Sequence, residues 1–256
     1  MGNIQTKRFW KNLARISVIL IILCGCVSTS PSWNVTKSEH YTFYYRPGSL
    51  AEEHIAFIVE IQEMSYTRII TTLHVTFDQK IDYYLYPSRW DKLFTMGDRS
   101  GGCANPLFTE VHAVYMEGGK TIGCHEDTHI ICYWTLGNPP PFLQEGLAVS
   151  MMESWYGRPV HEWAREFLPK KRLIPLKSLL ISHNFSKYNT KVTYPQSGSF
   201  TKYIIDMYGI EKFKTVYSQA IDETVESVFW NVYGKSIDEL EQEWIVYLEN
   251  LKTISE

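Results

Sequence analysis

Residues 124–129 carry the side chains with the clearest chemical potential: His125, Glu126 and His129 form the pattern H-E-x-x-H. On a helix, residues four apart project from one face, one turn apart, so both imidazoles can reach a single zinc ion. Glu126 follows His125 by about 100° around the helix, close enough to hold a water beside the ion without ligating it. The pattern therefore predicts a zinc site that activates water for hydrolysis.

The alternative interpretation is a surface helix in which both histidines are solvated and Glu126 is an ordinary helix-favouring charge. The flanking residues 121–123 and 130–134 are strongly apolar, which favours a helix inside the protein. Buried His and Glu side chains need partners, and a shared cation would satisfy all three. The metal interpretation is therefore preferred.

A third protein ligand is expected from the next segment. The extended pattern H-E-x-x-H-x-x-G-x-x-H is absent, because Cys132 and Thr135 occupy its Gly and last His positions. Residues 137–141 (GNPPP) end the first helix and turn the chain back, since proline cannot continue a helix. The apolar helical segment 142–149 then carries one carboxylate, Glu145, which an antiparallel return would bring level with His129.

Glu145 stands in the sequence F-L-Q-E-G-L-A, residues 142–148. Together with H-E-x-x-H, this setting resembles the gluzincin metallopeptidases and most closely the peptidase MA-like family, in which a glutamate from the next helix completes the zinc site. The similarity extends over roughly residues 80 to 250. It implies a zincin-like fold, one Zn²⁺ per chain bound by His125, His129 and Glu145, and Glu126 as the general base of peptide-bond hydrolysis.

Other parts of such a site are less well defined by the sequence. Some gluzincins brace a histidine with an acidic residue four positions after the glutamate ligand, but Val149 stands there. Tyr194 is the first candidate for the donor that stabilises the developing oxyanion and His161 the second, with ordinary structural roles as the alternative for both. The strand expected at residues 111–116 is either a sheet edge that binds an extended peptide or an interior strand.

The elements that must position these residues follow from local patterns. Strands are predicted at residues 41–45, 81–86 and 111–116, and apolar spacing predicts a helix over residues 50–73. Residues 101–106 are predicted to form a loop, and the pattern after the H-E-x-x-H motif is helical almost throughout. We expect an α+β fold in which a small mixed sheet precedes a mainly helical C-terminal half.

The first 25 residues differ in composition from the rest, because they contain no acidic residue and four basic ones, Lys7, Arg8, Lys11 and Arg15. The apolar run 16–23 is too short to span a bilayer and leads into L-C-G-C, which resembles a bacterial lipobox with Cys26 as the lipid-bearing residue. We expect a signal peptide at residues 1–25, a lipid-anchored tether at 26–38 and a single zincin-like metallopeptidase domain at 39–256. An uncleaved membrane anchor is one alternative, and N-terminal myristoylation is another.

Composition limits the class of protein further. With 45% hydrophobic and 21% charged residues, the chain is globular rather than disordered. A net charge of −3 argues against a nucleic-acid partner. We therefore expect a zinc metallopeptidase that acts on a peptide or protein and is anchored in the cell envelope as a lipoprotein on the extracytoplasmic side. The alternatives are a catalytically silent zincin-fold lipoprotein that serves as a binding or structural module, and a hydrolase of non-peptide amides.

Overall fold

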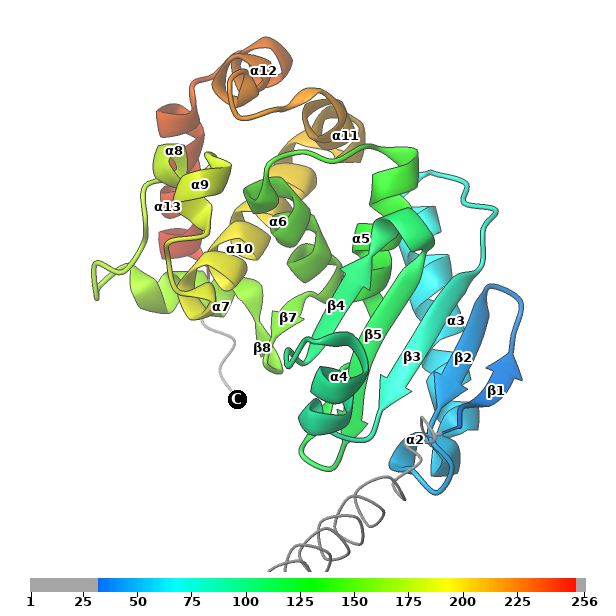
Figure 1. The fold of residues 1–256 in the computed structure, drawn as a ribbon. Coiled ribbons are helices and arrows are strands. Elements are labelled where there is room, and N and C mark those ends of the chain that lie inside the picture. The colour runs from blue at the N-terminus through cyan, green and yellow to red at the C-terminus, as the bar shows by residue number, and fades with distance from the viewer. Residues whose placement is uncertain (1–31, 252–256) are drawn as a thin grey trace, which may run out of the picture. The chain divides into compact units, whose positions relative to one another are not determined.

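A mixed sheet forms the first half of the protein in the computed structural model, which describes residues 32–251 (Figure 1). Its strands lie in the order β1, β2, β3, β5, β4, and the short β6 also pairs with β5. Strands β2, β3 and β5 run parallel, whereas β1 and β4 are antiparallel to their neighbours. The strand bounds are β1 Asn34–Lys37, β2 Tyr41–Tyr45, β3 Ile81–Tyr86, β4 Gly102–Asn105, β5 Glu110–Met116 and β6 Gly119–Lys120.

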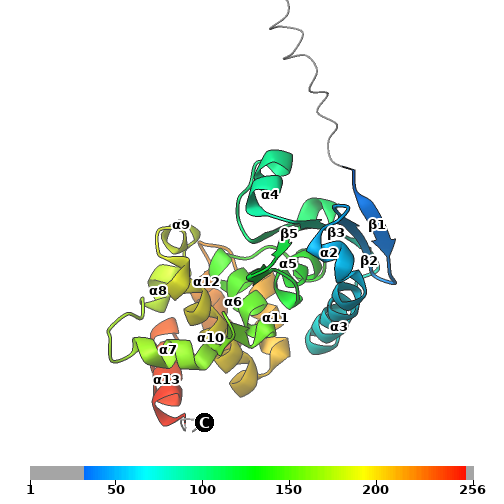
Figure 2. The same cartoon turned by 90° about the horizontal axis from the view of Figure 1, so that it is seen from below.

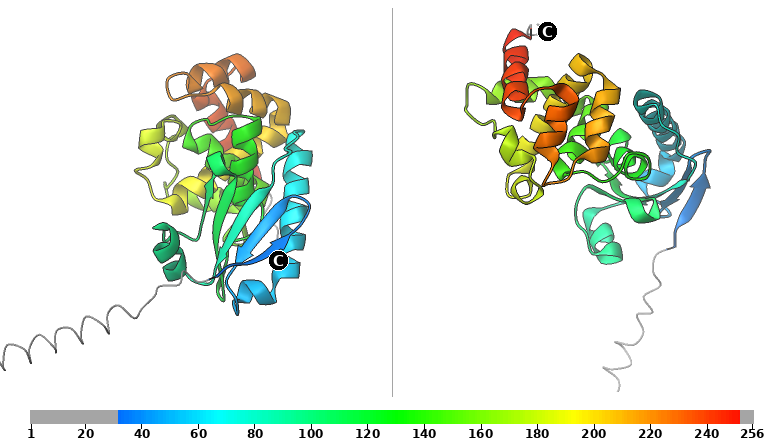
Figure 3. Two further views of the ribbon diagram at one scale, coloured as in Figure 1. Left: turned by 45° about the vertical axis from the view of Figure 1, so that its right-hand side comes forward. Right: turned by 90° about the horizontal axis from the view of Figure 1, so that it is seen from above.

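Alternating side chains give the sheet its buried face. Tyr41, Phe43, Tyr83 and Leu85 are fully buried and point to the same face, because residues two apart on a strand share a side. The Tyr41 hydroxyl reaches the carbonyl of Gln62 on α3 at 3.0 Å. Helices α2 (Leu50–Glu53) and α3 (Ile55–Leu73) lie on one side of the sheet, and α4 (Arg89–Met96) lies on the other (Figure 3).

The second half of the described chain is helical, apart from a small two-stranded hairpin. Helices α5 and α6 lie between the sheet and the remaining helices (Figures 1 and 2). A second set of buried aromatic side chains, which includes Phe200, Phe229 and Trp244, fills this half. The bounds are η1 Pro106–Phe108, α5 Cys124–Thr135, α6 Pro141–Met152, β7 Ser154–Trp155, β8 Arg158–Pro159, α7 Val160–Phe167, α8 Leu176–Leu179, α9 Ser182–Phe185, α10 Thr190–Tyr208, α11 Ile210–Gln219, α12 Val225–Tyr233 and α13 Ile237–Asn250.

Helices α6 and α10 approach each other closely because glycines line their contact. A Cβ atom on Gly146 of α6 would lie 2.4 Å from the Thr201 hydroxyl and 3.1 Å from the Ser197 carbonyl oxygen of α10. On the other helix, a Cβ on Gly198 would lie 2.4 Å from Val149. Small residues at these positions therefore set the distance between the two helix axes.

The α+β fold predicted from the sequence is confirmed, with differences at the sheet edges. Residues 34–37, assigned to the tether, form β1, so the folded part begins before residue 39. Residues 102–105, predicted as a loop, form β4, and residues 111–116 lie in the interior strand β5 rather than at an edge. Both edge strands are short and lack an apolar run, because an edge strand pairs through its backbone on one side only and needs no apolar pattern of its own. The predicted helix 50–73 is divided at His54 into α2 and α3.

Within residues 32–251, none of the helices combines the length and the apolar character needed to cross a membrane. The predicted signal peptide at residues 1–25 and the predicted lipid site Cys26 lie outside the described residues.

The contact between α6 and α10 gives a stability prediction. We expect Gly146→Ala to lower the free energy of unfolding by about 1–3 kcal/mol, because overpacking at this contact outweighs the better helix propensity of alanine. Urea denaturation measures the change. In a Gly146→Ala/Thr201→Ala double variant the nearest clashing oxygen is gone, so the combined loss should be smaller than the sum of the single losses. Strict additivity would contradict this account of the contact.

Candidate metal centre

The first turn of α5 is held in place by a buried hydrogen-bond network. Helix α5 begins after Gly123, whose φ of 109° lies in the region that favours glycine. The Gly123 amide donates to Gln62 Oε1 at 2.6 Å, and Gln62 Nε2 donates to Asp127 Oδ2 at 2.9 Å. The Tyr41 hydroxyl lies 2.5 Å from the same oxygen, and burial raises the pKa of Asp127 to about 8. The network thus ties α5 to both α3 and β2.

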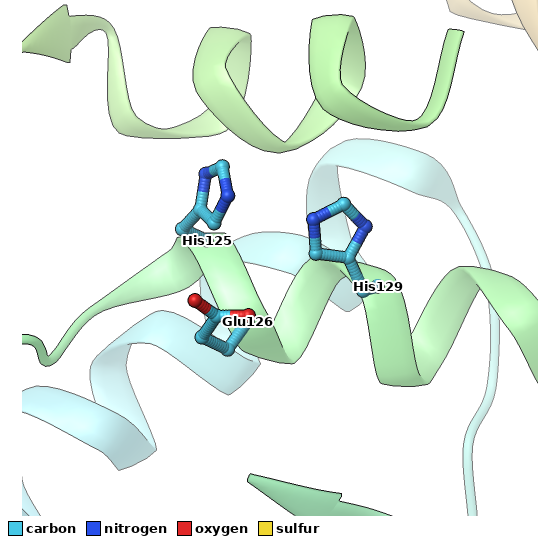
Figure 4. A group of neighbouring side chains, drawn as sticks. All are labelled: His125, Glu126 and His129. Carbon is cyan, nitrogen blue, oxygen red and sulfur yellow. The ribbon is translucent and has the colours of Figure 1, made fainter. Parts of the chain in front are cut away.

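Three side chains from two helices converge beside this turn. His125 and His129 project from the same side of α5 (Figure 4), and Glu145 faces them from α6. Glu145 Oε2 lies 3.4 Å from His125 Nε2 and 3.6 Å from His129 Nε2. The three side chains are 12–20% exposed, so the site is mostly buried but reachable from solvent.

The geometry and the donor set fit a zinc ion. In a tetrahedral site with metal–ligand distances of about 2.0–2.1 Å, neighbouring ligand atoms lie about 3.3 Å apart, close to the two separations above. Among the described residues, the buried Glu145 Oε2 has no hydrogen-bond partner, and neither has His125 Nδ1. Orphaned buried polar atoms are uncommon in proteins. A cation between the three side chains would satisfy the carboxylate oxygen.

The same groups perturb each other's proton affinities. Burial alone would raise the pKa of Glu145, but the facing imidazoles of His125 and His129 hold it well below its ordinary range. Burial alone would lower the pKa of His129, but the Glu145 carboxylate raises it. Glu145 is therefore an anion at neutral pH, as a metal ligand must be.

Glu126 occupies a different side of α5 from the two imidazoles (Figure 4). It nevertheless lies close to them: one potential ligand atom from each of His125, Glu126 and His129 falls within 4.8 Å of the others. Its carboxylate packs against the edge strand β4, because a Cβ on Gly102 would lie 2.6 Å from Glu126 Oε1. The carboxylate is thus held between the histidines and the sheet edge.

Aromatic side chains form a wall beside His125. Tyr194 on α10 stacks on the His125 ring with centroids 6.2 Å apart, and Trp155 on β7 lies 6.1 Å from that ring. Burial, followed by the charge of Glu145, raises the pKa of Tyr194, so its hydroxyl stays protonated at neutral pH. Tyr194 was predicted from the sequence, whereas Trp155 was not: Gly157 marks the turn of its hairpin but not its contact with His125.

His161, the second oxyanion candidate, contacts other residues. Its Nδ1 atom lies 2.9 Å from the Ser199 hydroxyl, and its ring packs on Tyr247. Burial lowers the pKa of His161 to about 4. These contacts belong to the interface of α7 with α10 and α13, so they favour the structural role that the sequence left open.

Val149, which replaces the expected acidic brace, packs on Gly198 instead of a histidine. Within residues 32–251, no hydrogen bond to His125 Nδ1 takes the place of that brace. The orientation of His125 is therefore supported by packing against Tyr194 and Trp155.

Comparison with models of known protein families gives a match over most of the chain. The family model described as the Peptidase MA superfamily matches residues 66–250, a range that includes α5, α6 and α10. No curated protein matches the chain significantly.

The convergence of Glu145 with the histidines predicts its effect on metal content. We expect about one zinc per chain in the purified wild type and loss of most of it in Glu145→Gln, because removal of one of three protein ligands opens the site. Inductively coupled plasma mass spectrometry measures the ratio. Glu153→Gln is the matched control, since Glu153 caps the same helix and is exposed. Equal zinc in both variants would remove Glu145 from the ligand set.

Proposed function

Since the chain belongs to the Peptidase MA superfamily, we propose that it is a zinc metallopeptidase anchored through a lipid on Cys26 and facing the extracytoplasmic side of the cell envelope. In this proposal His125, His129 and Glu145 hold one Zn²⁺, and Glu126 is the general base. The observation that carries it is the unpartnered carboxylate oxygen of Glu145, which faces both imidazoles beside a second, separately held carboxylate.

The proposed roles follow from the position of each side chain. When bound, a zinc ion in such a ligand set supplies Lewis acidity, which polarises a carbonyl group and makes a nearby water more acidic. Glu126 takes the proton of the attacking water and passes it to the leaving amine. Its place against Gly102 supports this role, because the carboxylate stays within 4.8 Å of both histidines yet lies on a different side of the helix, so it is near the site without being one of the three ligands.

Tyr194 is the proposed donor to the developing oxyanion. A donor must keep its proton through the reaction, and the raised pKa of the Tyr194 hydroxyl ensures that it does. The charge of the Glu145 carboxylate contributes to that shift. Stacking on His125 fixes the ring that carries it.

A peptide or protein substrate is the class that this arrangement supports best. Strand β4 is an edge of the sheet, and edge strands bind extended peptides through backbone hydrogen bonds. Glu126 contacts β4 at Gly102. A peptide paired with β4 would therefore pass the general base.

The proposal predicts separate effects of base and ligand variants. We expect Glu126→Gln to lower kcat by at least about 10²-fold, because general-base catalysis is lost, while zinc content stays unchanged. His129→Ala should lose both activity and zinc. Hydrolysis of casein and of a peptide library, with zinc measured on the same samples, provides the comparison. Full zinc without cleavage of any substrate by the wild type would favour the silent binding module instead.

The contact between Gly102 and Glu126 gives a second activity prediction. A Cβ at position 102 would displace the carboxylate, so we expect Gly102→Ala to lower kcat about 10-fold or more, within the range that general-base catalysis supplies, with zinc retained. Gly101→Ala is the matched control, because its Cβ would meet Thr121 and Arg89 only at 3.4 and 3.5 Å. If both variants keep wild-type kcat, Glu126 does not act from its position at β4.

A further inference from the structure

Helix α4 reverses the usual arrangement of a surface helix: a lysine is buried and two aromatic side chains are exposed. Lys92 is fully buried, whereas Trp90 is 53% and Phe94 is 81% exposed. The two aromatic rings lie one turn apart and stack with centroids 6.0 Å apart. Surface helices normally bury such residues and expose lysine. An exposed aromatic pair that the fold itself holds outward indicates a contact with another apolar phase.

Polar bonds on its inner side hold α4 in this orientation. Lys92 Nζ forms an ion pair with Asp98 at 2.7 Å and donates to the Ser100 hydroxyl at 2.9 Å. Arg46, which follows β2, donates to Asp91 and to the Thr95 hydroxyl, both at 3.0 Å. Rotation of α4 to bury the aromatic rings would break this set of charge-assisted bonds.

The charges around the aromatic pair suit an anionic surface. Arg99 lies over the Trp90 ring, with its guanidinium carbon 4.0 Å from the ring centroid, and Arg89 donates to the Arg99 carbonyl at 3.0 Å. Both arginines are exposed. The nearby carboxylates Asp91 and Asp98 are paired with Arg46 and Lys92. Two exposed arginines beside exposed aromatic rings fit the headgroup region of an anionic bilayer.

The attachment point of the predicted tether lies next to the same helix. Asn34, the first residue of β1, pairs with Tyr45, the last residue of β2. Arg46, which follows β2, is bonded to α4. Seven residues, 27–33, separate Asn34 from Cys26. They span less than about 30 Å even when fully extended. A lipid on Cys26 would therefore keep α4 within reach of the bilayer surface.

We infer that α4 is a membrane-contacting element: Trp90 and Phe94 enter the interface of the bilayer that holds the Cys26 lipid, and Arg89 and Arg99 contact its phosphate groups. This inference rests on the proposed anchoring through Cys26. The contact fixes the orientation of the sheet relative to the membrane, which a single attachment point alone does not do.

The test uses the full chain reconstituted into vesicles of equal parts phosphatidylcholine and phosphatidylglycerol, with or without bromine on the acyl chains. Bromine quenches tryptophan fluorescence at short range. We expect quenching in the wild type and loss of most of it in Trp90→Phe. Trp230→Phe, which removes an equally exposed tryptophan (56%) on α12, should leave it unchanged. Trp90→Phe/Phe94→Trp, which moves the fluorophore one turn along the same face, should restore it.

Intact mass of the same preparations reports the lipid on Cys26, so the two proposals are tested separately. A lipid-modified chain in which Trp90→Phe changes no quenching would overturn the α4 contact and leave the anchoring in place. An unmodified chain that still shows Trp90-dependent quenching would overturn only the anchoring. If α4 instead joins two copies of the chain, light scattering of the detergent-solubilised protein would give a doubled mass that Trp90→Ala/Phe94→Ala halves, with no bromolipid quenching. That result would also overturn the inference.

Discussion

The candidate metal centre depends on the position of α6, which lies between α5 and α10 and contributes to both contacts. The turn through Gly137 and the prolines after it returns the chain antiparallel to α5 and brings Glu145 opposite the histidines. The next residue, Gly146, has no side chain, and so α10 can approach from the other side. A larger residue there would move α10 and with it Tyr194, which stacks on His125. Glu145 therefore supplies a candidate ligand, and the adjacent Gly146 leaves the room that α10 needs to bring Tyr194 to the site.

Electrostatics favours a cation in this part of the protein. Asp127 and Glu145 place two buried carboxyl groups on neighbouring helices, and burial disfavours their charged forms. Burial raises the pKa of Asp127 to about 8, and hydrogen bonds from Gln62 and Tyr41 stabilise its charged form. Glu145 Oε2 instead faces the two imidazoles, at distances longer than those of good hydrogen bonds. The two buried carboxyl groups thus differ in their surroundings: hydrogen bonds from neighbouring elements surround Asp127, whereas Glu145 lies where a shared cation would fit.

Sequence patterns predicted most of the site but less of the sheet. His125, Glu126, His129 and Glu145 could be selected because helical spacing and the proline-containing turn limit where their side chains can go. The α+β class followed from apolar periodicity, and β3 was predicted with its observed bounds. Strands β1 and β4 were missed because an edge strand is defined by its partner's backbone and needs no apolar pattern of its own. Trp155 was missed for a related reason: its proximity to His125 depends on the packing of β7 against α6 and α10, which leaves no local signal.

Helix α4 shows the limit of periodicity most directly. Its sequence, R-W-D-K-L-F-T-M, places Trp90, Leu93 and Phe94 at helical spacing, which would normally be read as a buried face. The observed orientation follows from Lys92 and Asp91, whose partners Asp98 and Arg46 lie outside the helix. Arg89 also packs near Gly101, one residue before the glycine that contacts Glu126. Gly101 and Gly102 therefore connect the proposed membrane contact to the proposed general base. A bilayer at α4 would lie at one end of the β4 edge, where a peptide is expected to bind.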